Sequence, residues 1–332
     1  MIRSRNWGFE RFSGLYLWAA LILAFSLWQE QFATQATAHS VAAERSITAI
    51  LALAIIIPLT CDTFDLSVGA VANFATINAV LLINSGWAWP AAAIAAILIS
   101  SAIGAVNGFL VVKMQVNSFI TTLGTWSVIT AVQVIVTGNV QPIQPLSQSW
   151  TDLTHRTLFG FQVVVAFLIV IAIFVWWVLA HTPVGRYLYA IGSNKEAARL
   201  SGVPVDRYTW MSLIASATLA GIAGVLFGSL TGPSLTYGAG LLLPAFAAAF
   251  LGSTQVVPGR FNVWGTILAV FVLATGVKGL QLAYPQAQWL DPMFSGAALI
   301  LAVAIAEGRQ RATEERRRKR LVHAVGNDSI AA

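Results

Sequence analysis

Charged residues are scarce in this chain, and cysteine is almost absent. Of the 332 residues, 10% are charged and 57% are hydrophobic, and Cys61 is the single cysteine. A soluble domain carries about 25% charged residues, so the composition excludes an ordinary soluble protein and indicates a membrane-embedded bundle. One cysteine excludes an internal disulfide framework and a metal site built from clustered cysteines. The four histidines show no H-E-x-x-H or similar spacing.

Two further absences concern function. The chain has no G-x-x-x-x-G-K-[ST] sequence, so it cannot cradle nucleotide phosphates in the usual P-loop manner. It also has no acid–base or metal constellation typical of an enzyme. If ATP drives its activity, a separate polypeptide must hydrolyse the ATP. The net charge of +6 does not indicate a nucleic-acid partner, because the basic residues lie in predicted loops and in the tail.

Long apolar runs dominate what is present. Runs of about 20 apolar residues can cross a bilayer core of about 30 Å, so we predict an all-α membrane protein with about ten transmembrane helices. The first run is too long and too rich in tryptophan for a typical signal peptide, and we expect an uncleaved span there. The predicted spans, of which the second and eighth are short, are 13–32, 46–60, 66–84, 88–112, 117–137, 161–180, 210–230, 239–252, 262–282 and 289–306.

Lysine and arginine are distributed unevenly between the two sides of these spans. With the N-terminus inside, all of the 19 Lys and Arg residues except Arg45, Arg156 and Lys278 fall on the cytoplasmic side, as the positive-inside rule requires. We therefore expect both termini in the cytoplasm and a central cytoplasmic loop, 181–209, with five spans on either side. Residues 1–310 are the predicted transmembrane domain. Residues 311–332 are a basic tail that we expect to be disordered and attracted to anionic lipid.

The central loop contains a polar, charged island, residues 193–204, between apolar runs. Ser193 and Glu196 have the S-x-x-E spacing of a capping box, which predicts a short helix that begins at Ser193. Gly202 is placed to end this helix in a left-handed conformation, and Pro204 prevents its continuation. A helix of about two turns is too short to be stable alone, so it must lean on the rest of the protein or on a partner.

This island also resembles a known segment. Its E-A-A-x-x-x-G sequence, from Glu196 to Gly202, resembles the cytoplasmic coupling loop of ABC importer permeases, in which a short helix sits in a groove of the ATPase. The wider string from His181 to Arg207 resembles the ribose/xylose/galactoside branch of that family. An ordinary solvated connector is the alternative. The resemblance implies an ATPase-coupling role for Ser193, Asn194, Glu196, Ala197, Ala198, Leu200 and Gly202.

A second polar island, residues 60–69, contains the D-L-S-V-G string of the same permeases at 65–69. The family usually carries two glycines just before it, where this chain has Asp62 and Thr63. Asp65 is placed to N-cap the following helix, but a broken segment at membrane depth could also line a transport route. The string at 117–125 resembles the family's x-F-I-x-T-L-G-T, which suits either helix packing or contact with a sugar. The translocation-path candidates are Asp62, Asp65, Ser67, Asn73, Thr121, Thr122 and Thr125.

The resemblance implies the membrane-spanning permease subunit of an ABC importer, which translocates a monosaccharide or related polyol across the bacterial cytoplasmic (inner) membrane by alternating access. Its expected partners are an ABC ATPase subunit, a periplasmic or extracellular sugar-binding protein, a second permease subunit in a homo- or heterodimer, and membrane lipid. No cofactor is expected in this chain, because the ATPase would bind ATP and Mg. The alternatives are a branched-chain amino-acid permease and an ion-coupled secondary transporter, in which Asp62 or Asp65 would carry the ion.

Overall fold

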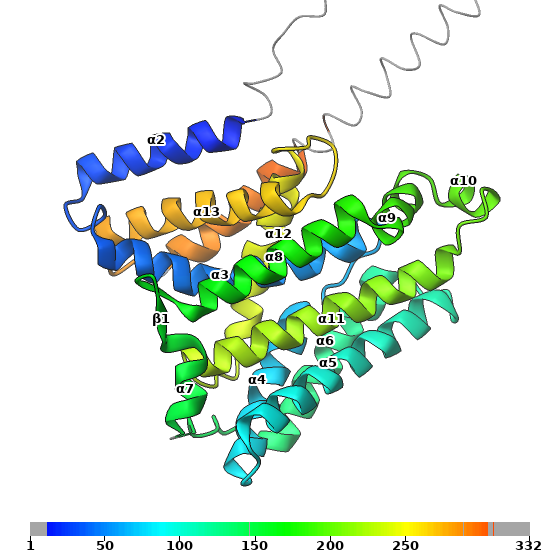
Figure 1. Cartoon of the computed structure of the whole chain (residues 1–332), viewed down its shortest axis with the longest axis horizontal. Coiled ribbons are helices and arrows are strands. Elements are labelled where there is room, and N and C mark those ends of the chain that lie inside the picture. The colour runs from blue at the N-terminus through cyan, green and yellow to red at the C-terminus, as the bar shows by residue number, and fades with distance from the viewer. Residues whose placement is uncertain (1–11, 146, 288, 305–307, 309–332) are drawn as a thin grey trace, which may run out of the picture.

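The computed structural model describes residues 12–145, 147–287, 289–304 and 308, so the predicted tail, 311–332, lies outside the described residues. Figure 1 shows the described chain as a bundle of helices with one short hairpin. The elements are α2 (Ser13–Trp28), α3 (Gln35–Leu59), α4 (Val68–Asn84), α5 (Trp89–Val112), α6 (Ser118–Thr137), α7 (Gln148–His155), β1 (Thr157–Leu158), β2 (Phe161–Gln162), α8 (Val163–His181), α9 (Pro183–Ser193), α10 (Lys195–Leu200), α11 (Val205–Leu230), α12 (Tyr237–Ser253) and α13 (Val263–Ala283). A last apolar helix, Leu290–Ala304, follows without a label.

Each predicted span coincides with an apolar helix. The expected division into five spans on either side of 181–209 is wrong, because six of the ten apolar helices precede α9 and four follow α10. Six of these helices, α3, α5, α6, α8, α11 and α13, are long and apolar enough to cross a membrane. Four are shorter, namely α2, α4, α12 and Leu290–Ala304. The second span is longer than predicted, because α3 extends back to Gln35, where the Thr34 hydroxyl accepts the N–H of Thr37 at 3.3 Å.

The core of the bundle lies along α3 and α11. Residues 46–59 of α3 are buried on every side, which is the pattern of a helix enclosed by other helices. α11 packs along α3, α4 and α5. It approaches α4 so closely that a Cβ added to Gly224 would lie 2.0 Å from the carbonyl oxygen of Ala72. Small residues permit such close packing in a membrane, where lipid chains give helices no hydrophobic reason to associate.

α7 and the β-hairpin lie between α6 and α8, and neither was predicted from the sequence. The strands pair antiparallel, with Thr157 opposite Gln162 and Leu158 opposite Phe161. α7 is held against α11 by the fully buried Trp150, whose carbonyl oxygen accepts the Ser229 hydroxyl at 2.7 Å. Among the described residues the fold is all-helical apart from this hairpin. A strand of two residues is too short to leave a periodic pattern in the sequence.

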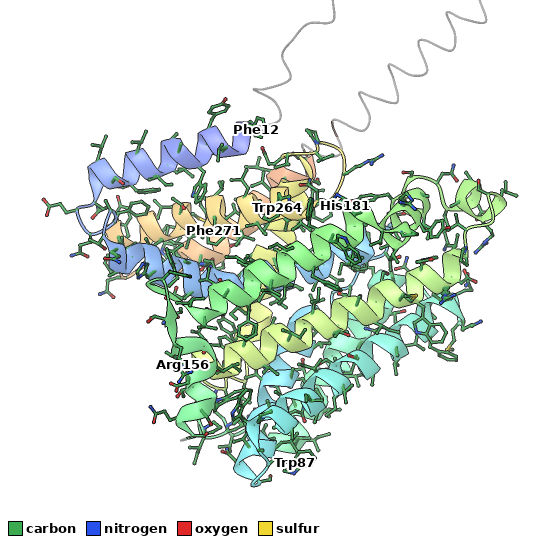
Figure 2. The ribbon with its side chains drawn as sticks, in the orientation of Figure 1. Phe12, Trp87, Arg156, His181, Trp264 and Phe271 are labelled. Carbon is green, nitrogen blue, oxygen red and sulfur yellow. The ribbon has the colours of Figure 1, made fainter. Side chains whose placement is uncertain are left out.

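Basic residues gather at one end of the bundle. α9 and α10 lie at this end, and α7 and the hairpin lie at the opposite end (Figure 1). One groove near α10 is lined by Lys113, Arg199 and Arg207, and a second groove beside α9 is lined by Arg186 and Arg260. Arg156 lies at the opposite end (Figure 2). We call the end that carries α9 and α10 the basic end. Its charge agrees with the predicted grouping of these residues on one side.

Candidate functional site

The short helix in the central loop is α10, and its N-terminus differs from the prediction. α9 continues through Ser193, whose hydroxyl donates to the carbonyl of Tyr189 at 2.8 Å. Asn194 is the N-cap residue: its backbone is extended, and its Oδ1 accepts the N–H of Ala197 at 2.9 Å. The predicted capping box of Ser193 and Glu196 is therefore wrong. Ser193 is already committed to the preceding helix, and the Glu196 carboxylate lies 3.9 Å from the Arg199 guanidinium instead.

The C-terminus of α10 ends as predicted. Gly202 has a φ of +80°, a left-handed conformation that favours glycine. Its N–H donates to the carbonyl of Arg199 at 3.0 Å, and the N–H of Val203 donates to the carbonyl of Ala198 at 3.1 Å. This pair of bonds is the Schellman arrangement, which satisfies carbonyl groups at a helix end. The Pro204 position then leads directly into α11.

α10 presents one apolar side chain to its surroundings. Leu200 is 89% exposed, although it is a large hydrophobic residue at the tip of the basic end. Ser193, Asn194, Glu196, Ala197 and Gly202 are also exposed, so six of the seven predicted coupling residues share an open surface. Ala198 is the exception, because it is only 5% exposed and packs against its own chain. We call the exposed residues of α10 and its two caps, from Asn194 to Gly202, the α10 surface.

α9 connects the α10 surface to the interior. Gly192 lies against the backbone of the second polar island: a Cβ added there would come within 2.2 Å of the Thr60 carbonyl oxygen. On another side, burial raises the pKa of the Tyr189 phenol above its ordinary value, so the hydroxyl stays protonated and donates to the Phe261 carbonyl at 2.6 Å. A movement of α9 would therefore press directly on the segment at residue 60 and on the turn before α13.

The second polar island is non-helical where it enters α4. Asp65 is fully buried, and its Oδ1 accepts both the N–H of Ser67 at 3.0 Å and the hydroxyl of Ser67 at 2.6 Å. α4 begins at Val68, with Ser67 at the N-cap position. The prediction that Asp65 is the N-cap residue is therefore wrong by two positions. Its carboxylate instead forms the turn that leads into the helix, a local bond typical of aspartate before a helix.

α5 and α6 supply the partners of this turn. Asn107, on α5, donates to the Ser67 hydroxyl at 3.0 Å and accepts the Thr125 hydroxyl at 2.6 Å. Thr122 accepts the N–H of Leu66 at 3.0 Å. The structure thus brings four predicted residues, Asp65, Ser67, Thr122 and Thr125, into one buried group with Asn107. We call these five residues the central polar layer.

The other candidates lie outside this layer. Asn73 donates to Gln133 Oε1 at 2.8 Å and to the Leu235 carbonyl at 3.0 Å, and it accepts the N–H of Gly238 at 3.2 Å. Gln133 was not among the predicted site residues. Its side-chain amide also donates to the Leu235 carbonyl at 2.8 Å. The feature that could have revealed Gln133 is its amide side chain in the apolar interior of the predicted fifth span. Together Asn73 and Gln133 hold the start of α12.

Thr121 and Asp62 belong neither to the central polar layer nor to the contacts that hold the start of α12. Thr121 is 7% exposed, and its hydroxyl has no hydrogen-bond partner among the described residues. Asp62 is exposed and has a φ of +55°. Glycine adopts this left-handed conformation freely, and aspartate is one of the few other residues that adopts it readily.

Comparison with known proteins identifies relatives over most of the chain. A sequence model of the family described as "Branched-chain amino acid transport system / permease component" matches residues 37–303. The "Autoinducer 2 import system permease protein LsrC" of Escherichia coli strain HS is 29% identical over 310 residues, which cover 92% of this chain and 90% of that protein. The protein of the same name from Salmonella typhi is 28% identical and covers 89% of this chain and 84% of that protein.

A solved structure is also similar. "PsaBC from Streptococcus pneumoniae in complex with Fab" matches with a TM-score of 0.43 and 14% sequence identity, covering 87% of this chain and 93% of that chain.

Proposed function

Since the chain belongs to the family of branched-chain amino acid transport system permease components, we propose that it is the subunit of an ABC importer that translocates a monosaccharide or a related polyol. As a permease component it is a multi-pass protein of the bacterial inner membrane, and it catalyses no bond change itself. The family match over residues 37–303 is the observation that carries the assignment as an importer permease subunit.

The substrate class rests on three supports. The D-L-S-V-G string resembles sugar permeases, and the relatives reported above are named for import of autoinducer 2 rather than an amino acid. The central polar layer offers hydroxyl and amide groups, with Asp65 already bound to Ser67. Such groups suit a neutral molecule with many hydroxyls.

A branched-chain amino acid is the second candidate, because the family description names that substrate. Uptake of a panel of labelled monosaccharides and polyols, measured beside leucine, isoleucine and valine in the same cells, separates the two. We expect deletion of the gene to abolish uptake of one polyol and to leave the three amino acids unaffected. Loss of amino-acid uptake alone would support the second candidate.

The proposed topology has ten spans, with the basic end and both termini in the cytoplasm. It places six spans before the α9–α10 segment and four after it, so an even number of crossings returns this segment to the side of the N-terminus. The short helices α4 and α12 are counted among the spans because each lies inside the bundle, next to long helices that cover it.

Cysteine labelling tests this topology. In a Cys61→Ala background, we expect Ala197→Cys to resist an impermeant thiol reagent in intact cells, because Ala197 lies on the α10 surface in the cytoplasm. Ser149→Cys, an exposed position at the opposite end, should label readily and serves as the matched control. Both cysteines should label after the membrane is permeabilised. External labelling of Ala197→Cys would reverse the orientation.

The α10 surface is the proposed docking site for the ATPase. Leu200 would supply an apolar anchor, and the polar residues around it would supply the rim of the contact. ATP and Mg would be bound by that partner. A second permease subunit, as a homo- or heterodimer, and a sugar-binding protein outside would complete the importer. The contact of Gly192 with Thr60 supports a route from the ATPase to the central polar layer.

Two substitutions of Asp65 distinguish a structural role of this residue from a role in transport. We expect Asp65→Asn to change stability little, because the amide oxygen still accepts from Ser67. Asp65→Leu leaves two buried donors without their acceptor and should lower the free energy of unfolding by about 1–3 kcal/mol. Thermal unfolding of the purified protein in detergent measures both. If Asp65→Asn unfolds normally but uptake is abolished, the negative charge itself is used in transport.

A further inference from the structure

A second groove at the basic end lies beside α9 and includes Ser193, the residue that precedes the α10 surface. It has a volume of about 560 Å³ and lies between the end of α8, α9 and the turn before α13. We call it the α8–α9 groove. None of the residues from Asn194 to Gly202 lines it.

The groove carries positive charge that no acidic side chain of the described residues neutralises. Arg186 and Arg260 line it, and both side chains are exposed. No aspartate or glutamate belongs to its lining, and within the part of the chain that the structure describes neither guanidinium forms an ion pair. The other groove differs, because its Arg199 lies 3.2 Å from the Asp206 carboxylate. The guanidinium carbon of Arg260 stands 5.4 Å from the centre of the Tyr189 ring, which holds it beside the groove.

The rest of the groove is apolar and aromatic. Trp176 and Trp264 line it with their ring centres 6.2 Å apart, and Leu179 and Val263 add aliphatic surface. Figure 2 shows Trp264 and His181 close together near the end of α8. Tryptophan concentrates at the depth of lipid headgroups. Trp176 precedes the end of α8 at His181 by about 7 Å along the axis, at the usual rise per residue, which agrees with that depth.

The groove also opens beside a helix that faces lipid. α8 is the most apolar of the long helices, and little of it is buried within the chain. Its exposed side chains include Ile169, Val170, Ile173, Phe174 and Trp177. An acyl chain can therefore lie along α8 while its headgroup reaches the two arginines.

We propose that the α8–α9 groove binds the phosphate headgroup of an anionic phospholipid from the cytoplasmic leaflet. Arg186 and Arg260 contact the phosphate, and Trp176 and Trp264 contact the glycerol region and the first part of an acyl chain. Guanidinium groups match phosphate geometry through paired hydrogen bonds. Basic pockets between membrane helices on the cytoplasmic side are the type of site that selects such headgroups.

Native mass spectrometry of the full-length chain in detergent tests this proposal. The probes are phosphatidylglycerol, phosphatidylcholine and soluble glycerol phosphate. We expect retention of phosphatidylglycerol by the wild-type protein and about 30-fold weaker retention by the double variant Arg186→Gln, Arg260→Gln, because each arginine near an anionic headgroup contributes a factor of about five. Arg207→Gln, which removes one charge at the same end but outside the groove, is the matched control and should bind like the wild type.

Three outcomes overturn the proposal. If the double variant and the wild type retain phosphatidylglycerol equally, the two arginines do not form a lipid-binding site. Equal binding of soluble glycerol phosphate and of the lipid makes it a phosphate site instead. If the double variant retains the lipid normally but no longer binds the ATPase, the groove is a protein-docking surface. If the double variant aggregates, the lysine pair Arg186→Lys, Arg260→Lys keeps both charges. This lysine variant should fold and retain phosphatidylglycerol. Phosphatidylcholine should bind selectively neither to the wild type nor to the lysine variant.

Discussion

Leu200→Asp should abolish the stable association of this permease with its ATPase. Leu200 is 89% exposed at the tip of α10, where no other part of the described chain covers it. An apolar anchor at the centre of a protein interface contributes about 2 kcal/mol or more, so loss of the anchor should weaken binding at least about 30-fold. We expect co-purification with the ATPase to fail and uptake to fall by a similar factor. Affinity capture of the ATPase by tagged permease measures the effect.

The matched control is Leu158→Asp, the same change at a position that is 52% exposed at the opposite end. It should leave ATPase binding unchanged. Both variants should insert and fold normally, since both positions lie outside the apolar helices. Wild-type capture of the ATPase by Leu200→Asp would show that α10 is not the docking element.

Gly192→Val should uncouple ATP hydrolysis from transport. The added Cβ would come within 2.2 Å of the backbone carbonyl oxygen of Thr60, which cannot turn aside as the end of a flexible side chain can, so α9 and the segment at residue 60 must separate. The α10 surface is not altered, and we expect the ATPase to bind. Uptake should fall more than about tenfold, because a displacement of about 1 Å in a positioned contact can cost a factor of about 100. Uptake and ATP hydrolysis, measured in the same proteoliposomes, report the two effects separately.

Gly240→Val is the control for this change. It places the same side chain at a helical glycine in α12, where an added Cβ meets nothing within 4 Å. It should transport like the wild type. If Gly192→Val also transports normally, the contact between α9 and Thr60 does not transmit motion.

The sequence predicted the location of the apolar helices well, because a span of about 20 apolar residues has few alternatives in a folded protein. It also predicted the end of α10, since Gly202 followed by Pro204 favours a left-handed stop. The predicted start of α10 was wrong for a physical reason. Ser193 and Asn194 can both cap a helix, and only the length of α9 decides between them. Ala197 and Ala198 are adjacent and have the same side chain, yet Ala197 is exposed and Ala198 is buried.

Long-range partners account for the remaining differences. Asn107 joins Ser67 to Thr125 across three segments that are far apart in the sequence. Gln133 meets Asn73 in the same way. A polar side chain within an apolar run shows that a partner is needed, but it does not show which one. The central polar layer could therefore be predicted as a set of candidates and not as a connected group.

Transport by purified components in proteoliposomes tests the central claim most directly. The permease is reconstituted with its ATPase and binding protein, and uptake of the labelled polyol is followed with Mg-ATP supplied only on the side of the basic end. We expect uptake under this condition, no uptake with a proton gradient alone, and no ATP hydrolysis by the permease without its partner. Uptake driven by a proton gradient in the absence of ATP would contradict the assignment of this chain as the permease subunit of an ATP-driven importer.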